Sequence, residues 1–141
     1  MDRRNFIRLG VAGGVATLFS PSLANTTKAT GGAPSLMAGG IFYTQANPGR
    51  WGKKVSGHLP VIEKGKDKIQ VITGHVMQAH EHYITKHTLL DRDFNFLDEF
   101  LFDPTKHKSA KSEFATQKYS GKIYVLSHCN KHDTWMNEIE L

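Results

Sequence analysis

A single cysteine followed three positions later by a histidine is the part of this sequence best suited to metal chemistry. Cys129 and His132 are separated by Asn130 and Lys131, and Cys129 is the only cysteine. At a turn, a thiolate and an imidazole with this spacing can converge on one ion, and the soft sulfur favours a transition metal over magnesium or calcium. Taken alone, the pair is also compatible with a small buried thiol beside a surface histidine, which is common for free cysteine.

The other histidines favour the interpretation of Cys129 and His132 as metal ligands. Four of the eight histidines lie at expected turns or strand ends: His58, His75, His80 and His82. His128 has the opposite parity to Cys129 in the preceding apolar run, so it should point to the other face of that strand. Several histidines that can approach one Cys-x-x-His pair favour a metal site over isolated surface residues.

Short strands are the elements expected to position these residues. Apolar or β-branched runs are bounded by turn residues, and no long stretch keeps a 3.6-residue apolar period. The runs cover residues 41–44, 69–73, 83–90, 94–102, 122–127 and 135–141. The phenylalanines of 94–102 share one parity, which predicts a strand with a Phe-rich face. The pattern predicts an all-β fold, a β-sandwich of about seven strands.

Length and charge limit the function classes. The 141 residues suffice for one domain with a real core, and the net charge is +5. Residues 1–24 carry +2 of this charge, so the remaining chain has a net charge of +3. Its basic residues are interleaved with acids and form no dense stripe with stacking aromatics. We therefore expect no nucleic-acid partner.

The N-terminus has the pattern of an export signal. Arg3 and Arg4 are followed by a short Gly/Ala-rich apolar stretch and the small-residue site Ser22-Leu23-Ala24. The arginine pair predicts a twin-arginine signal peptide over residues 1–24, with cleavage before Asn25. We expect a flexible leader over 25–39 and a single domain over 40–141. The mature protein would be periplasmic or otherwise exported, without stable membrane insertion after cleavage.

Three motifs in order resemble a known family. They are Gly57-His58-Leu59-Pro60-Val61-Ile62-Glu63, then His75-Val76-Met77 with His82-Tyr83-Ile84, then Cys129-Asn130-Lys131-His132 with Trp135. Together they resemble superoxide reductase, the iron domain of desulfoferrodoxins and neelaredoxins, over residues 40–141. The resemblance implies an immunoglobulin-like β-sandwich. No four-cysteine rubredoxin-type segment precedes the domain, so the sequence resembles the one-iron type.

The resemblance also implies a ligand set for one mononuclear iron that cycles between Fe2+ and Fe3+. The equatorial imidazoles would be His58, His75, His82 and His132, and the axial thiolate would be Cys129. Family members usually separate the second and third histidines by five residues, whereas six residues separate His75 and His82. The longer spacing leaves His80 as an alternative to one of them.

Two positions depart from the family pattern. Many members have Glu-Lys before the first histidine, where this chain has Ser56-Gly57. We therefore predict that no carboxylate ligates the oxidised iron. Lys53, Lys54 and Lys131 are candidates for the missing positive charge, and we assign this electrostatic role to Lys54. Asp133 stands where family members commonly have glycine, and it could perturb the turn or receive a hydrogen bond.

The activity implied by the resemblance is the one-electron reduction of superoxide to hydrogen peroxide. The re-reducing electron would come from a separate donor protein, rubredoxin-like or cytochrome-like, and assembly into a homo-oligomer is left open. The alternative is an exported cupredoxin-like copper electron carrier, with Met136 as a weak axial ligand. That alternative leaves the motifs around His58, His75 and His82 unexplained.

Overall fold

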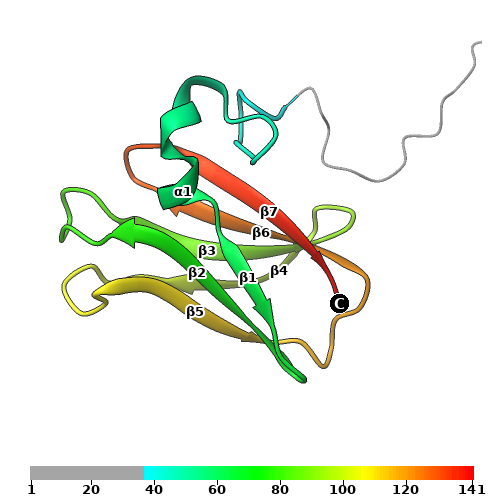
Figure 1. The fold of residues 1–141 in the computed structure, drawn as a ribbon. Helices are drawn as coiled ribbons and strands as arrows, with labels where there is room; N and C mark the ends of the chain where they lie inside the picture. The colour runs from blue at the N-terminus through cyan, green and yellow to red at the C-terminus, as the bar shows by residue number, and fades with distance from the viewer. Residues whose placement is uncertain (1–36) are drawn as a thin grey trace, which may run out of the picture.

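Two antiparallel sheets form the domain (Figure 1). The computed structural model describes residues 37–141, so the predicted signal peptide and residues 25–36 of the predicted leader lie outside the described residues. One sheet has the order β1 (Val61–Lys64), β2 (Lys68–Val76), β5 (Ser109–Ala115). The other has the order β4 (Phe96–Leu101), β3 (Ile84–Asp91), β6 (Lys122–Cys129), β7 (Thr134–Glu140). The predicted all-β sandwich with seven strands is confirmed.

Alternating side chains from both sheets fill the space between them. In β2, Ile69 and Val71 point inward, and in β6 Ile123 and Val125 do so, each at most 1% exposed. Leu89 of β3 and Phe114 of β5 complete the core cluster. The parity predicted for β6 is confirmed, because this inward face continues through Ser127 to Cys129.

The predicted Phe-rich face of residues 94–102 is only partly correct. Leu89 pairs with Asp98 and Leu90 with Phe96, so a bulge places one extra residue, Leu97, in β4. A bulge reverses the side-chain alternation, since two residues of one strand then face one of its partner. Phe96 is consequently 62% exposed, while Leu97 packs against the core.

A helical segment precedes the first strand. It consists of η1 (Gly49–Lys54) and α1 (Val55–His58), and Figure 1 shows α1 beside one end of the sheets. Gly49 opens the segment with φ of +46°, where a Cβ atom would lie 2.9 Å from the ring of Tyr43. Within residues 37–141, no helix is long and apolar enough to cross a membrane.

A buried polar layer joins the two sheets. His87 of β3 is fully buried and contacts hydroxyls of two strands of the other sheet: Thr73 of β2 at 2.9 Å and Ser112 of β5 at 2.8 Å. Thr73 also donates to Ser127 of β6 at 2.9 Å. Every polar atom of His87 therefore has a partner, as burial requires. Thr73 and Ser127 lie two residues before His75 and Cys129 on their strands, so this layer supports the end of the sandwich where those residues lie.

Candidate metal centre

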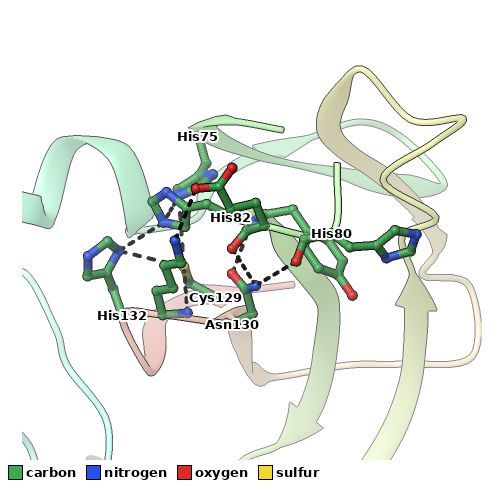
Figure 2. Close-up of polar contacts among 9 residues, drawn as sticks. His75, His80, His82, Cys129, Asn130 and His132 are labelled. Carbon is green, nitrogen blue, oxygen red and sulfur yellow. Dashed lines mark hydrogen bonds and ion pairs between the residues drawn. The ribbon is translucent and has the colours of Figure 1, made fainter. Parts of the chain in front are cut away.

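Five side chains from five separate parts of the chain converge at one end of the sandwich. His58 ends α1, His75 lies near the end of β2, and Cys129 ends β6. His82 precedes β3, and His132 lies in the turn between β6 and β7. One potential ligand atom from each of the five lies within 4.8 Å of all the others. Figure 2 shows His75, His82, Cys129 and His132 directed toward a common point.

The four imidazoles present their inner nitrogens as the corners of a near-square. His58 Nε2 lies 2.9 Å from His132 Nδ1, which lies 3.1 Å from His82 Nε2. His82 Nε2 in turn lies 3.0 Å from His75 Nε2. The centre of a square with an edge of about 3 Å lies about 2.1 Å from each corner, which is the usual length of a bond from a metal ion to an imidazole nitrogen. The residues present therefore fit a metal ion.

The ring planes agree with this interpretation. Three pairs of neighbouring rings around the square are nearly perpendicular, at 82° for His58–His75, 88° for His75–His82 and 89° for His58–His132. The fourth pair, His82–His132, is inclined at 70°. Rings placed edge-on to one another aim their nitrogen lone pairs at the centre instead of at each other's protons. The arrangement is thus suited to four metal–nitrogen bonds and poorly suited to hydrogen bonds within the cluster.

The outer nitrogen of His58 fixes its orientation. His58 Nδ1 donates to the backbone carbonyl of Lys54 at 2.9 Å, which leaves Nε2 unprotonated and directed inward. The outer nitrogen of His75, Nδ1, is buried and has no hydrogen-bond partner. Metal-binding histidines commonly use their second nitrogen in this way to hold the ring, so His58 is the better anchored of these two.

Burial keeps the cluster neutral. Desolvation is the largest cause that lowers the pKa of His58, to about 4, and nearby histidines add to it. Desolvation also lowers the pKa values of His75, His82 and His132. Neutral imidazoles are the form that binds metal, so at neutral pH the four rings are ready to ligate without losing a proton.

The thiol lies on the core side of the cluster. Cys129 is 7% exposed and packs with Ile84, Phe102 and Ala110. Its Sγ lies 3.7 Å from His132 Nδ1 and 3.8 Å from His75 Nε2, and it accepts the backbone N–H of Lys131 at 3.4 Å. His82 and His132 are partly exposed, so the imidazole side of the cluster is more open to solvent than the buried cysteine.

Asn130 joins the two loops that carry the site. Its Oδ1 accepts the backbone N–H of Tyr83 at 3.0 Å, and its Nδ2 donates to the carbonyls of His80 and Glu81 at 3.3 and 3.1 Å (Figure 2). These bonds hold the segment with the longer histidine spacing against the Cys129 turn. The structure brings His82 into the cluster and leaves the exposed ring of His80 directed away from it.

Two lysines place positive charge near the cluster, and no carboxylate of the described residues belongs to the cluster itself. The charges of Lys54 and Lys131 each contribute to the lowered pKa values of His82 and His132, so both are felt at the site. Glu81 partly offsets Lys131, with a contact of 3.8 Å. Among residues 37–141, the converging group contains four histidines and one cysteine and no acidic side chain.

Asp133 receives hydrogen bonds instead of perturbing the turn. Its backbone is left-handed, with φ of +61°, a conformation that glycine adopts freely and aspartate tolerates. Its carboxylate accepts bonds from Arg50 and from the Trp51 indole, and these two bonds hold its pKa below the usual range. Sequence reasoning missed Trp51 entirely, because no motif or period marks it.

His128 and His107 lie outside the cluster. His128 points to the other face of β6, as its parity predicted, and bonds to Thr88 and Thr134. His107 receives the backbone N–H of Asp103 and packs on Phe100.

The donor set does not favour the blue-copper arrangement. That arrangement needs two histidines, one cysteine and a weak axial methionine. Met136 is instead 5% exposed in an apolar cluster with Phe42 and Tyr124, on β7 and outside the ligand group. Four imidazoles and one thiolate also exceed the four ligands of a structural zinc site. The set suits a redox-active transition metal with five protein donors.

Proteins that are similar to this chain in sequence or fold are described as desulfoferrodoxins, neelaredoxins or superoxide reductases. The family model described as Desulfoferrodoxin matches residues 50–138. A superoxide reductase of Pyrococcus abyssi is 35% identical, over 60% of this chain and 86% of that protein. A superoxide reductase of Thermococcus kodakarensis is 37% identical over the same shares. The solved neelaredoxin of Ignicoccus hospitalis, also described as a superoxide reductase, is 26% identical with a TM-score of 0.59, over 72% of this chain and 94% of that one.

Proposed function

The chain belongs to the desulfoferrodoxin family, and from this premise we propose that it is a superoxide reductase with one mononuclear iron. The observation that carries the proposal is the near-square of four inner imidazole nitrogens with the Cys129 sulfur beside it. We assign the iron ligands as His58, His75, His82, His132 and Cys129.

The overall reaction takes one electron and two protons for each superoxide and gives one hydrogen peroxide. When bound, the iron supplies the electron by passing between its ferrous and ferric states. The chain contributes five donors and leaves the partly exposed imidazole side for the substrate. Cys129 would hold the metal from the core side, and a thiolate donor would raise the electron density there.

Electrostatics favour an anionic substrate. Lys54 and Lys131 bring positive charge to a cluster of neutral imidazoles, and this attracts a small anion over distances of about a Debye length. We retain Lys54 as the main electrostatic residue, because the charge of Lys131 is partly offset by Glu81. No acidic side chain belongs to the cluster, so we propose that protons reach the product through water.

The reaction itself provides the test. Reduced, iron-loaded protein mixed with superoxide should be oxidised with one hydrogen peroxide formed per iron and no dioxygen released from superoxide. Dioxygen formed together with peroxide in equal amounts would mean dismutation and would contradict the proposal. Copper with an intense blue absorption band would favour the electron-carrier alternative.

We propose that a separate protein returns the electron. The single cysteine cannot provide a four-cysteine rubredoxin centre within this sequence, which supports an external donor, either rubredoxin-like or cytochrome-like. Stopped-flow mixing of the oxidised protein with a reduced rubredoxin or a reduced c-type cytochrome would compare the two. Reduction by neither, over seconds at micromolar concentrations, would contradict both assignments.

We propose also that residues 1–24 direct export by the twin-arginine route. The support is the Arg3-Arg4 pair, the apolar stretch and the small-residue site before Asn25. The protein should accumulate in the periplasm of its host with Asn25 as its first residue, which N-terminal sequencing would detect. Replacing both arginines with lysine should keep the precursor inside the cell, and unchanged export would contradict the assignment.

A further inference from the structure

Asp133 links two distant parts of the metal site. Its Oδ2 atom lies 2.5 Å from Arg50 Nη2 and 2.8 Å from Trp51 Nε1, and both donors belong to η1. Its backbone carbonyl accepts the N–H of Cys129 at 2.9 Å. One residue therefore connects the start of the helical segment to the turn that carries Cys129 and His132.

The indole that Asp133 holds lies against a ligand ring. The Trp51 and His132 rings are edge to face, with centroids 4.7 Å apart and an angle of 82° between their planes. Trp51 is half-buried, so it covers part of a ring that is itself only half-buried. Rotation of His132 away from the other three nitrogens would have to displace the indole.

The same segment also orients the first histidine. From Trp51 the chain runs directly through Lys54, whose carbonyl accepts the Nδ1–H of His58 at 2.9 Å. A bond that fixes η1 to the Cys129–His132 turn thus acts on two neighbouring corners of the nitrogen square, which lie 2.9 Å apart.

We propose that Asp133 is a positioning residue of the metal centre, which holds Trp51 against His132 and so slows the loss of the metal. The inference rests on the proposed metal centre and not on superoxide reduction itself. Hydrogen-bonded groups that support metal ligands typically change metal affinity by about 10- to 100-fold when they are removed. We expect the lower end of that range, because Asp133 acts on His132 through Trp51.

The first test uses protein loaded with cobalt(II) and measures metal release to an excess of EDTA. Asp133→Gly should release cobalt about tenfold faster than the unaltered protein. Glycine adopts the left-handed backbone freely, which offsets the loss of the two side-chain hydrogen bonds, so the metal-free form should unfold at a similar denaturant concentration. Faster release with unchanged metal-free stability separates loss of positioning from general unfolding.

Two further variants separate the indole contact from the charge. Asp133→Asn keeps an oxygen acceptor for Trp51 and loses the ion pair with Arg50, so its release rate should stay within about threefold of the unaltered protein, since exposed ion pairs contribute little. Trp51→Phe keeps an aromatic ring and loses the donor, so it should release cobalt faster than Asp133→Asn. Equal acceleration in Asp133→Asn and Asp133→Gly would overturn the role of Trp51.

Spectra give a readout that a merely structural role would not change. The ligand-field bands of bound cobalt should shift in Asp133→Gly and in Trp51→Phe, because His132 changes its orientation. They should stay unchanged in Lys68→Ala, which removes a remote exposed ion pair with Glu113. Failure of the unaltered protein to bind cobalt through Cys129 would refute the metal centre. Normal binding with the same release rate and spectrum in Asp133→Gly would refute this inference alone.

Discussion

Two groups of histidines differ in what their nitrogens face. Both nitrogens of His87 contact hydroxyls, of Thr73 and Ser112, and both nitrogens of His128 do the same with Thr88 and Thr134. In the metal cluster, the inner nitrogens face only one another and the Cys129 sulfur. Burial lowers the pKa values in both groups, to about 3 for His87 and about 4 for His58 and His128.

The difference shows that burial and a lowered pKa do not by themselves identify a metal ligand. A buried histidine with two hydroxyl partners is satisfied and binds the sheets together. A histidine whose inner nitrogen faces other nitrogens at about 3 Å has a lone pair that only a metal ion or a proton can satisfy. Substitutions in the two groups should therefore have opposite consequences for metal content and stability.

The largest effect is expected at the thiolate. Cys129→Ser replaces a soft ligand by a hydroxyl, which is a poor ligand for this metal, so iron and superoxide-reducing activity should both be lost. Iron analysis and the thiolate-to-iron absorption band measure the outcome. A variant that keeps full iron and full activity would show that the site assignment is wrong.

A pair of substitutions tests the choice between two neighbouring histidines. His82→Ala removes one corner of the nitrogen square, so iron affinity should fall by more than about 100-fold, beyond the usual cost of losing only a ligand's hydrogen-bond partner. His80→Ala is the matched control and should retain one iron per chain. The opposite result would assign the corner to His80.

In the other group, His87→Phe should reduce stability without removing iron. The change leaves the hydroxyl of Ser112 without its partner and weakens the layer between the sheets, so the free energy of unfolding should fall by about 2 kcal/mol. Denaturant unfolding of the metal-free protein measures this loss. Loss of iron with unchanged stability would contradict the assignment of His87 to the structural histidines.

The same residue predicts a dependence of stability on pH. The pKa of His87 is lowered to about 3, mainly by burial and also by the charge of His128, against 6.5 in the unfolded chain. Above pH 6.5 His87 is neutral in both states, whereas below it only the unfolded state takes up the proton. Stability is thus lost as the pH falls from 6.5 toward 3, by up to about 1.4 kcal/mol per pH unit from this one group.

Comparison with His87→Phe isolates this contribution. Urea unfolding of both metal-free proteins between pH 7.5 and 5 should show the shallower dependence in the variant. Parallel curves for the two proteins would mean that other histidines cause the whole dependence.

The smallest effect concerns the charge near the centre. Lys54→Gln should slow the reaction of superoxide by a few-fold at low ionic strength and leave iron content unchanged, because a single exposed charge acts through steering. The difference from the unaltered protein should shrink in about 0.5 M salt, where screening is strong. A salt-independent loss would indicate that Lys54 acts by contact.

The sequence predicted the sandwich well, because alternation of apolar residues is set by burial of one strand face. Residues 69–73 and 122–127 follow that rule without interruption, and both lie within strands with the expected inward face. The face of 94–102 was predicted correctly for Phe100 and Phe102, which pack in the core, and wrongly for Phe96, which is exposed. The bulge at Leu97 arises from pairing with β3, which the local sequence does not reveal.

The site was partly predictable for a similar reason. His58, His75 and Cys129 each lie within a short motif of neighbouring residues, so the sequence alone marks them, and the structure brings them together. The choice between His80 and His82 depends on the Asn130 bonds to the neighbouring loop. The contact of Trp51 with His132 depends on Asp133, which is 82 residues away along the chain. Such long-range contacts have no signature in spacing or composition.

X-ray absorption at the iron edge of the reduced protein tests the central claim most directly. The account predicts one iron per chain, with four nitrogen scatterers from imidazole and one sulfur scatterer. The sulfur should vanish in Cys129→Ser, if that variant is reconstituted at high iron. An iron without a sulfur neighbour in the unaltered protein, or copper in its place, would contradict the assignment of Cys129 and the four histidines as the ligands of this centre.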